Sequence, residues 1–184
     1  MNNLKLSSIW ISVWCVFFAI TRKEEYLSLL CGKGIKLLNG QYYRLFTGLL
    51  LHVNVFHLLS NSIALYWVGE FLEKTISIHK LLMISIISGI IEEIIFSYIF
   101  PYRSGYGGSP VIFGLIGFLT VQQLLGGSVI RWEFGTVYSN WIIGYALLAN
   151  IPVFSKDISA LICHSIAFAV GCCLSGIDIL LKFI

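Results

Sequence analysis

Long apolar runs, separated by short polar stretches, make up most of this chain. Six runs approach the roughly 20 residues that an α-helix needs to cross the hydrocarbon core of a bilayer. They cover residues 4–20, 53–71, 81–100, 111–125, 141–154 and 158–184. The fourth and fifth are short for full spans, which favours helices that begin below the membrane surface and face a water-filled cavity. The pattern predicts an all-α, polytopic membrane protein, with residues 1–184 as one transmembrane domain.

The stretch between the first two apolar runs, residues 21–51, has a mixed pattern. It contains five lysine and arginine residues, yet it ends in the apolar sequence Leu45-Phe-Thr-Gly-Leu-Leu-Leu51. A mixture of this kind suits an element that lies at the interface, partly inside the bilayer, better than a solvated loop. We therefore expect a membrane-embedded first loop.

Composition supports a membrane protein and excludes several other classes. The 184 residues are 58% hydrophobic and only 11% charged, whereas soluble domains have about 25% charged residues. The mean hydropathy is +0.88. The net charge of +3 is small and scattered, so we expect no nucleic-acid partner. The five cysteines lie mostly in apolar runs without metal-ligand spacing and indicate small apolar residues, not a disulfide framework.

The first apolar run is predicted to be a retained helix. It is followed by Thr21-Arg-Lys-Glu-Glu25 and not by a small-x-small cleavage site, so a signal peptide is the weaker interpretation. Charge alone does not support termini on the inner side, because that orientation places seven basic residues outside and five inside. The inner residues would be Lys5, Lys74, Lys80, Arg131 and Lys182, and the outer ones Arg103, Lys156 and the five of the first loop. If the first loop is treated as embedded and its five basic residues are left out, the count of basic residues favours termini on the inner side.

Ser109 lies in the sequence Gly107-Gly-Ser109-Pro110, at the start of the fourth apolar run. Proline fits the first turn of a helix, where its missing N–H costs nothing. Ser109 should then lie at or beside the N-cap, where the helix dipole stabilises negative charge on or near its oxygen. The glycines, Gly108 among them, leave room for a substrate backbone. A plain helix cap is the alternative.

His164 begins a face of small residues on the last apolar run, with Ala167 and Gly171 three and seven positions later. Such a face lets a neighbouring helix approach closely in a membrane. If that neighbour carries Ser109, His164 can act as its general base, and Phe113 can stack on the imidazole. The alternative is a hydrogen bond between helices without chemistry.

His57 and Asn61 are four residues apart and therefore share one face of a helix. Each can offer an N–H donor, and two donors aimed at one point form an oxyanion hole, worth about 3 kcal/mol per donor in soluble serine proteases. The alternative is a polar staple between helices. His52 is expected before the helix begins, in a structural role.

Glu92 and Glu93 are two adjacent carboxylates in the third apolar run. Neighbouring helical residues point about 100° apart, so the pair is not expected to share one narrow site. Ionised carboxylates are disfavoured in hydrocarbon, so either the pair borders a water-filled cavity or one member is protonated. A proton relay of a transporter would use such acids.

Taken together, these motifs resemble the rhomboid family of intramembrane serine proteases. The resemblance covers most of the chain, from Tyr43-Arg44 to Gly171. The second apolar run has the pattern His-x4-His-x3-Asn, followed by Gly69-x3-Glu73, and the later motifs follow in the same order as in the family. The later motifs are Gly107-Gly-Ser109 with Phe113, and His164 with Ala167 and Gly171.

The resemblance implies a six-helix bundle and a catalytic dyad of Ser109 and His164 without an aspartate. His57, Asn61 and the Ser109 backbone N–H would bind the oxyanion. The substrates would be single-span transmembrane proteins, cut near the outer end of the span. No metal or cofactor is implied, and the termini would be cytoplasmic, in a multi-pass protein of a bacterial cell membrane. The oligomeric state is not implied.

Two positions depart from the family pattern. Pro110 stands where glycine is usual, and Ala167 stands where glycine is commoner. Pro110 keeps a second hypothesis open, namely an inactive rhomboid-like protein that binds transmembrane clients without cutting them. A small proton-coupled transporter built around Glu92 and Glu93 is a third.

Overall fold

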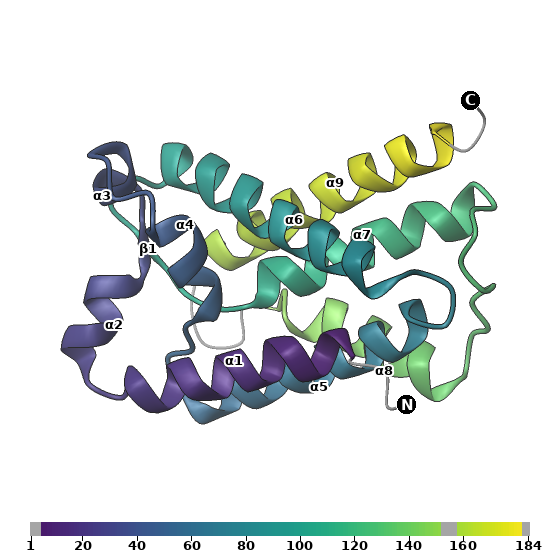
Figure 1. Ribbon diagram of the computed structural model, residues 1–184, viewed down its shortest axis with the longest axis horizontal. Helices are drawn as coiled ribbons and strands as arrows, with labels where there is room; N and C mark the ends of the chain where they lie inside the picture. The colour runs from purple at the N-terminus through teal and green to yellow at the C-terminus, as the bar shows by residue number, and fades with distance from the viewer. Residues whose placement is uncertain (1–4, 152–157, 182–184) are drawn as a thin grey trace.

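The computed structural model describes residues 5–151 and 158–181 and is mostly helical (Figure 1). Each predicted apolar segment contains one helix. These helices are α1 (Leu6–Ile20), α5 (Val55–Leu72), α6 (Ile78–Ile99), α7 (Ser109–Leu124), α8 (Val137–Leu148) and α9 (Ser159–Leu180). The predicted segment ends at residues 4, 154 and 184 lie outside the described residues. The start of α1 and the end of α9 lie at the same end of the bundle.

Helix caps explain where the helices begin relative to the apolar runs. The Asn54 side chain accepts a hydrogen bond from the His57 backbone N–H at 2.8 Å, so α5 begins at Val55. Thr136 caps α8 in the same way, which places the helix start four residues before the predicted Trp141. A side-chain cap satisfies a backbone donor that the first turn leaves free. Hydropathy alone does not detect this.

Two helices, α6 and α9, are long and apolar enough to cross a membrane. A third candidate is the broken pair formed by residues 44–50 and α5, bent by 93°. Among the described residues, α1, α7 and α8 are apolar but shorter. The protein is therefore an integral membrane protein, and the short fourth and fifth helices match the pattern of the sequence.

The first loop folds into a series of short elements beside α6. They are α2 (Glu24–Leu30), β1 (Gly32–Lys33), α3 (Gly34–Leu38), α4 (Arg44–Thr47) and the 3-10 helix η1 (Gly48–Leu50). β1 pairs antiparallel with β2 (Ser104–Gly105), which leads into α7. The Gly107 N–H also donates to the Gly48 carbonyl at 3.1 Å. The first loop therefore holds the segment that precedes Ser109.

Helix α7 is the most enclosed helix, and it packs against α6, α9 and α5. Its contact with α9 is close because a Cβ on Gly171 would overlap the Gly114 carbonyl. Likewise, a Cβ on Gly117 would overlap the Phe168 carbonyl. The small-residue face predicted on the last helix thus packs against the helix of Ser109, and Ala167 is fully buried there.

Helix α1 lies along α5. The Leu6 N–H donates to Glu73 Oε1 at 2.6 Å, and Gly69 faces Ser7 in the first turn of α1. Burial raises the pKa of Glu73, an effect that the Leu6 hydrogen bond opposes. The Gly69-x3-Glu73 motif therefore joins two helices.

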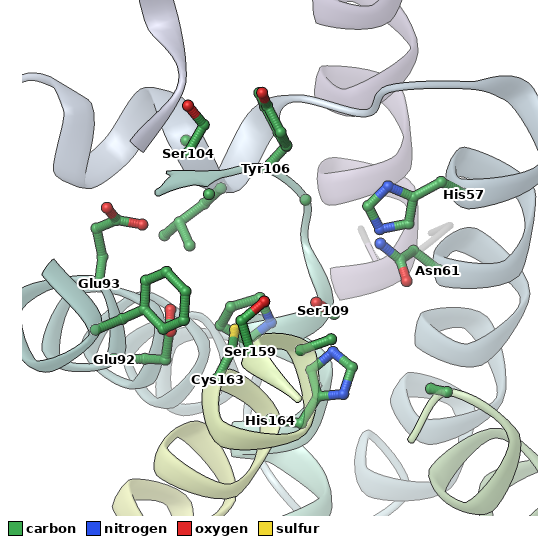
Figure 2. A pocket seen from close by; sticks show the side chains of 18 of the residues that line it. His57, Asn61, Glu92, Glu93, Ser104, Tyr106, Ser109, Ser159, Cys163 and His164 are labelled. Carbon is green, nitrogen blue, oxygen red and sulfur yellow. The ribbon is translucent and has the colours of Figure 1, made fainter. Parts of the chain in front are cut away.

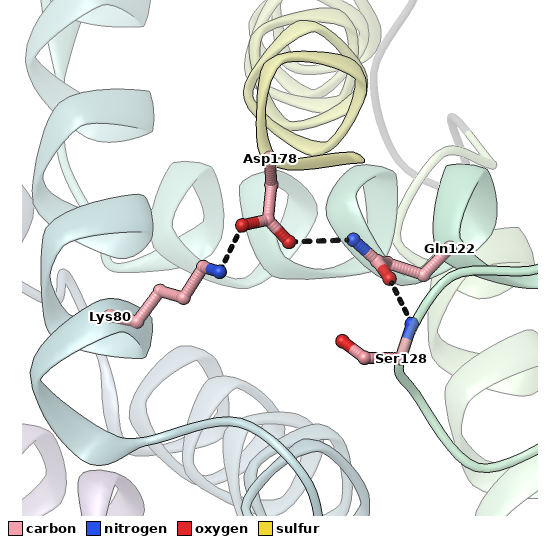
Figure 3. A network of polar contacts seen from close by, with 4 residues as sticks. All are labelled: Lys80, Gln122, Ser128 and Asp178. Atoms are coloured by element: carbon pink, nitrogen blue, oxygen red, sulfur yellow. Dashed lines mark hydrogen bonds and ion pairs between the residues drawn. The ribbon is translucent and has the colours of Figure 1, made fainter. Parts of the chain in front are cut away.

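A polar network lies at the end of the bundle opposite the start of α7 (Figure 3). Asp178 of α9 forms an ion pair with Lys80 of α6 and accepts a hydrogen bond from Gln122 Nε2 at 3.1 Å. Gln122 Oε1 in turn accepts from the Ser128 N–H at 3.0 Å. This network links α6, α7 and α9.

Candidate active site

A cavity of about 330 Å³ lies where α5, α6, α7 and α9 meet the β2 segment. Ser109, His164, His57 and Asn61 all line it, as Figure 2 shows. The four polar residues come from three different helices and are up to 107 positions apart in the sequence (57 to 164). Folding therefore brings together the residues that the sequence motifs single out.

Ser109 is the first residue of α7, with Gly108 at the N-cap and Pro110 in the first turn. Ser109 is 8% exposed. Gly107 has a φ of +119°, and a Cβ there would overlap the His57 ring. A Cβ on Gly108 would overlap the ring of Trp14. The two glycines thus let the backbone before α7 approach one side chain of α5 and one of α1 closely.

The His164 ring is fixed on two sides. The Phe113 ring stacks on it, with centroids 4.1 Å apart and an interplanar angle of 10°. Its Nδ1 lies 2.8 Å from Asn150 Oδ1. The Asn150 Nδ2 donates to the Ala146 carbonyl at 2.7 Å, which leaves Oδ1 to face the histidine. In a neutral ring, Nδ1 must then carry the proton, and Nε2 has the free lone pair of a base.

Sequence reasoning missed Asn150. It is a polar residue inside the fifth apolar run, which is a usable signal. Its partner, however, is in the next helix, and only the fold reveals this contact.

Asn61 is held by two side chains. Its Nδ2 lies 3.1 Å from His52 Nε2, and its Oδ1 accepts from the Tyr145 hydroxyl at 2.8 Å. One of the two Nδ2 hydrogens remains for the cavity. His52 precedes α5, as predicted, and its ring lies 5.0 Å from that of His57. His52 thus supports the His57 and Asn61 side chains from behind.

Glu92 and Glu93 both line the cavity, on the wall formed by α6. This is the first of the two alternatives derived from the sequence, since the pair borders a cavity. Glu92 is 2% exposed and Glu93 5% exposed. Their carboxyl groups point in different directions in Figure 2, as adjacent helical residues do.

An apolar groove of about 650 Å³ runs between α5 and α8. Phe56, Leu59 and Trp141 contribute to its walls. Ser60, Tyr145 and Ala149 line both the groove and the cavity. The groove and the cavity that contains Ser109 therefore share part of their walls.

The described residues contain no group of three or more His, Cys, Asp or Glu side chains arranged to hold a metal ion. The residues that line the cavity offer a hydroxyl, an imidazole and N–H donors. These are the groups of nucleophilic catalysis with a general base.

Comparison with known proteins gives consistent matches. A model of the Rhomboid domain matches residues 39–180. The chain is 35% identical over 98 residues to Rhomboid protease GluP of Bacillus subtilis (strain 168), which covers 53% of this chain and 19% of that protein. It is 28% identical over 167 residues to the candidate rhomboid protease YdcA of the same organism, which covers 89% of this chain and 82% of that protein. It is 34% identical over 82 residues to human Inactive rhomboid protein 2, which covers 45% of this chain and 10% of that protein.

Proposed function

Because the chain belongs to the rhomboid family, we propose that it is an intramembrane serine endopeptidase with Ser109 as nucleophile and His164 as general base. One observation carries the proposal. Ser109 and His164 line one cavity, and the imidazole is oriented by Phe113 and Asn150 so that Nε2 is free to accept a proton.

In the proposed reaction, the Ser109 hydroxyl attacks the scissile carbonyl while His164 Nε2 takes its proton. The tetrahedral intermediate then expels the amine, which receives that proton from His164. Water, deprotonated by the same nitrogen, hydrolyses the acyl-enzyme and restores the serine. Asn150 positions the ring through Nδ1, in the place where many soluble proteases have a carboxylate.

The oxyanion of the intermediate would be bound by His57, Asn61 and the Ser109 backbone N–H. The position of Ser109 in the first turn of α7 supports this role, because the free N–H groups and the dipole of a helix start stabilise negative charge. Contacts from His52 and Tyr145 keep Asn61 in place before substrate arrives. Preorganised donors of this kind are effective because they need no rearrangement during the reaction.

The proposed substrates are single-span transmembrane proteins. The apolar groove between α5 and α8 supports this choice, because exposed apolar side chains line it and it shares part of its wall with the cavity. We further propose that α1 and α5 to α9 form six spans, that the first loop is embedded in the membrane, and that the termini are cytoplasmic in a bacterial cell membrane.

An inactive, client-binding protein is the second candidate. The similarity to Inactive rhomboid protein 2 and the presence of Pro110 favour it. Pro110, however, lies in the first turn of α7, where a helix needs no N–H from it. The two glutamates line the same cavity as Ser109 and do not form a separate site, so the transporter hypothesis gains no support.

The test is cleavage of a panel of tagged single-span proteins in proteoliposomes by the wild type and by Ser109→Ala. We expect cleavage by the wild type and a loss of at least about 10⁴-fold in the variant. Equal cleavage by both would contradict the proposal. If neither cleaves, Pro110→Gly is tested next. Activity restored in that variant would identify the proline as the cause, whereas client capture without cleavage by any variant would favour the inactive candidate.

A further inference from the structure

The cavity extends beyond Ser109 and His164 to a buried carboxyl group that the proposed mechanism does not use. Glu92 lines the cavity, and its Oε1 has no hydrogen-bond partner among the described residues. It lies on the α6 side of the cavity, near Cys163, in Figure 2. A buried carboxyl oxygen without a hydrogen-bond partner is costly, so its presence beside the proposed substrate site fits a partner that the substrate brings.

The neighbouring carboxyl has a structural role instead. The Ser97 hydroxyl donates to Glu93 Oε1 at 3.3 Å. The Glu93 carboxyl also lies against Gly32 and Gly105, where a Cβ on either residue would meet it. Glu93 therefore supports the β1–β2 pair, whereas Glu92 has the Cys163 thiol beside its carboxyl and an Oε1 without a hydrogen-bond partner among the described residues.

Two carboxyl groups lie in the wall of the cavity, those of Glu92 and Glu93. None of the described residues that line the cavity is a lysine or an arginine. The nearest first-loop cation, Arg44, donates to the Cys31 carbonyl at 2.6 Å and to Gln41 at 2.8 Å. Leu49 and Phe96 add apolar walls beside the carboxyls. Apolar walls that lead to a buried carboxyl suit a side chain with an aliphatic stem and a cationic head.

Glu92 lies beside α9, the helix that contains the proposed base. Cys163, which precedes His164 in α9, has its thiol beside the Glu92 carboxyl. Glu92 therefore lies beside the residue that precedes the proposed base in α9. The cavity volume of about 330 Å³ is many times the roughly 30 Å³ of a liquid water molecule, so it has room for a substrate side chain.

We propose that Glu92 forms the end of a substrate subsite that takes a lysine or arginine side chain at the residue whose carbonyl Ser109 attacks. The inference rests on the proposed protease function and adds a substrate preference to it. The preferred substrates are then single-span proteins with a basic residue directly before the cut.

The test compares substrates that differ at one residue. A single-span protein that the wild type cuts is mapped by mass spectrometry, and the residue before the cut is changed to Lys, Met or Gln. We expect kcat/KM for Lys to exceed that for Met by about tenfold or more, because a charge-assisted contact is lost with Met. In Glu92→Gln this ratio should fall to about one, whereas the matched control Glu93→Gln should keep the wild-type ratio.

The outcomes separate the subsite from the protease. A wild-type ratio near one, equal cleavage of Gln and Lys substrates, or an unchanged ratio in Glu92→Gln would each overturn the subsite while leaving the protease in place. Absence of Ser109-dependent cleavage would overturn the protease. In that case, binding of Lys and norleucine peptides to the wild type, measured by thermophoresis, still tests the subsite. If Glu92→Gln does not fold, the wild-type ratios alone decide.

Discussion

Two polar clusters lie at opposite ends of α7, and they differ in how completely their groups are paired. At the C-terminal end of α7, both oxygens of Asp178 and both ends of the Gln122 amide have partners. At the other end, the cavity has Ser109, His164 and Glu92 around open space, and Glu92 Oε1 has no partner among the described residues.

The difference indicates separate purposes for buried polar groups in one bundle. A fully paired network joins helices and gains little from any added ligand. A partly paired set keeps donors and acceptors available for a reacting molecule, at a cost in stability. Variants in the first cluster should therefore change stability, and variants in the second should change catalysis.

The largest expected effect in the cavity, short of removing Ser109 or His164, comes from His57→Ala. Loss of one oxyanion donor should lower kcat by about 10²–10³-fold, because the donor acts mainly in the transition state. Steady-state cleavage in proteoliposomes measures it. Tyr145→Phe is the comparison variant: it removes the hydroxyl that holds Asn61 but leaves both proposed oxyanion side chains, so it should lower kcat less than His57→Ala. If kcat is kept and only KM rises, His57 binds substrate but does not stabilise the oxyanion.

In the network at the C-terminal end of α7, Asp178→Ala should destabilise the fold by about 2–3 kcal/mol. The substitution leaves the buried Gln122 amide without an acceptor and Lys80 without a counter-ion. Thermal or denaturant unfolding in detergent measures the change. The double variant Lys80→Met with Asp178→Leu should recover part of it, since two apolar groups replace the pair. Unchanged stability with a large loss of kcat would contradict the division between the two ends.

A smaller effect is expected from Asn150. Asn150→Leu should reduce kcat/KM by about tenfold, because the His164 ring loses the acceptor that fixes its tautomer. Asn150→Asp should restore activity and move the acid limb of the pH profile upward, since a carboxylate favours the imidazolium. A purely structural role would predict low activity in both variants with the same pH profile.

The smallest expected effect is that of pH on the wild type. A histidine base works only when neutral, and the reference pKa of histidine is about 6.5. Activity should fall as the pH drops through the pKa of the base, reaching about half its plateau at that pKa. A profile from pH 5 to 8 in proteoliposomes checks this, and a flat profile would argue against His164 as the base.

Local patterns in the sequence were sufficient for the helices and for part of the site. Apolar runs predicted each long helix, and the spacing of His57 and Asn61 placed both on one face of α5. The sequence Gly-Gly-Ser-Pro predicted the start of α7 at Ser109. These features depend on residues close together in the chain, so periodicity and capping rules apply to them.

Other features depend on contacts between distant residues. The strand pair of Gly32 and Gly105 has two residues on each side, which is too short for a period-2 pattern to be visible. The contact of Asn150 with His164 and the network around Asp178 each join different helices. No local pattern specifies which polar residues of separate helices will meet, because that depends on how the helices pack.

Helix α9 supplies a member to both clusters, His164 to the cavity and Asp178 to the network with Gln122 and Lys80. A ribosome makes this helix after α1 to α8, so the growing chain has a nucleophile without a base and a Lys80 without its acceptor. The protease we propose would therefore be inert throughout its own synthesis and would become competent only when its last described helix enters the bundle. Activation and locking of the fold would then occur in the same insertion event.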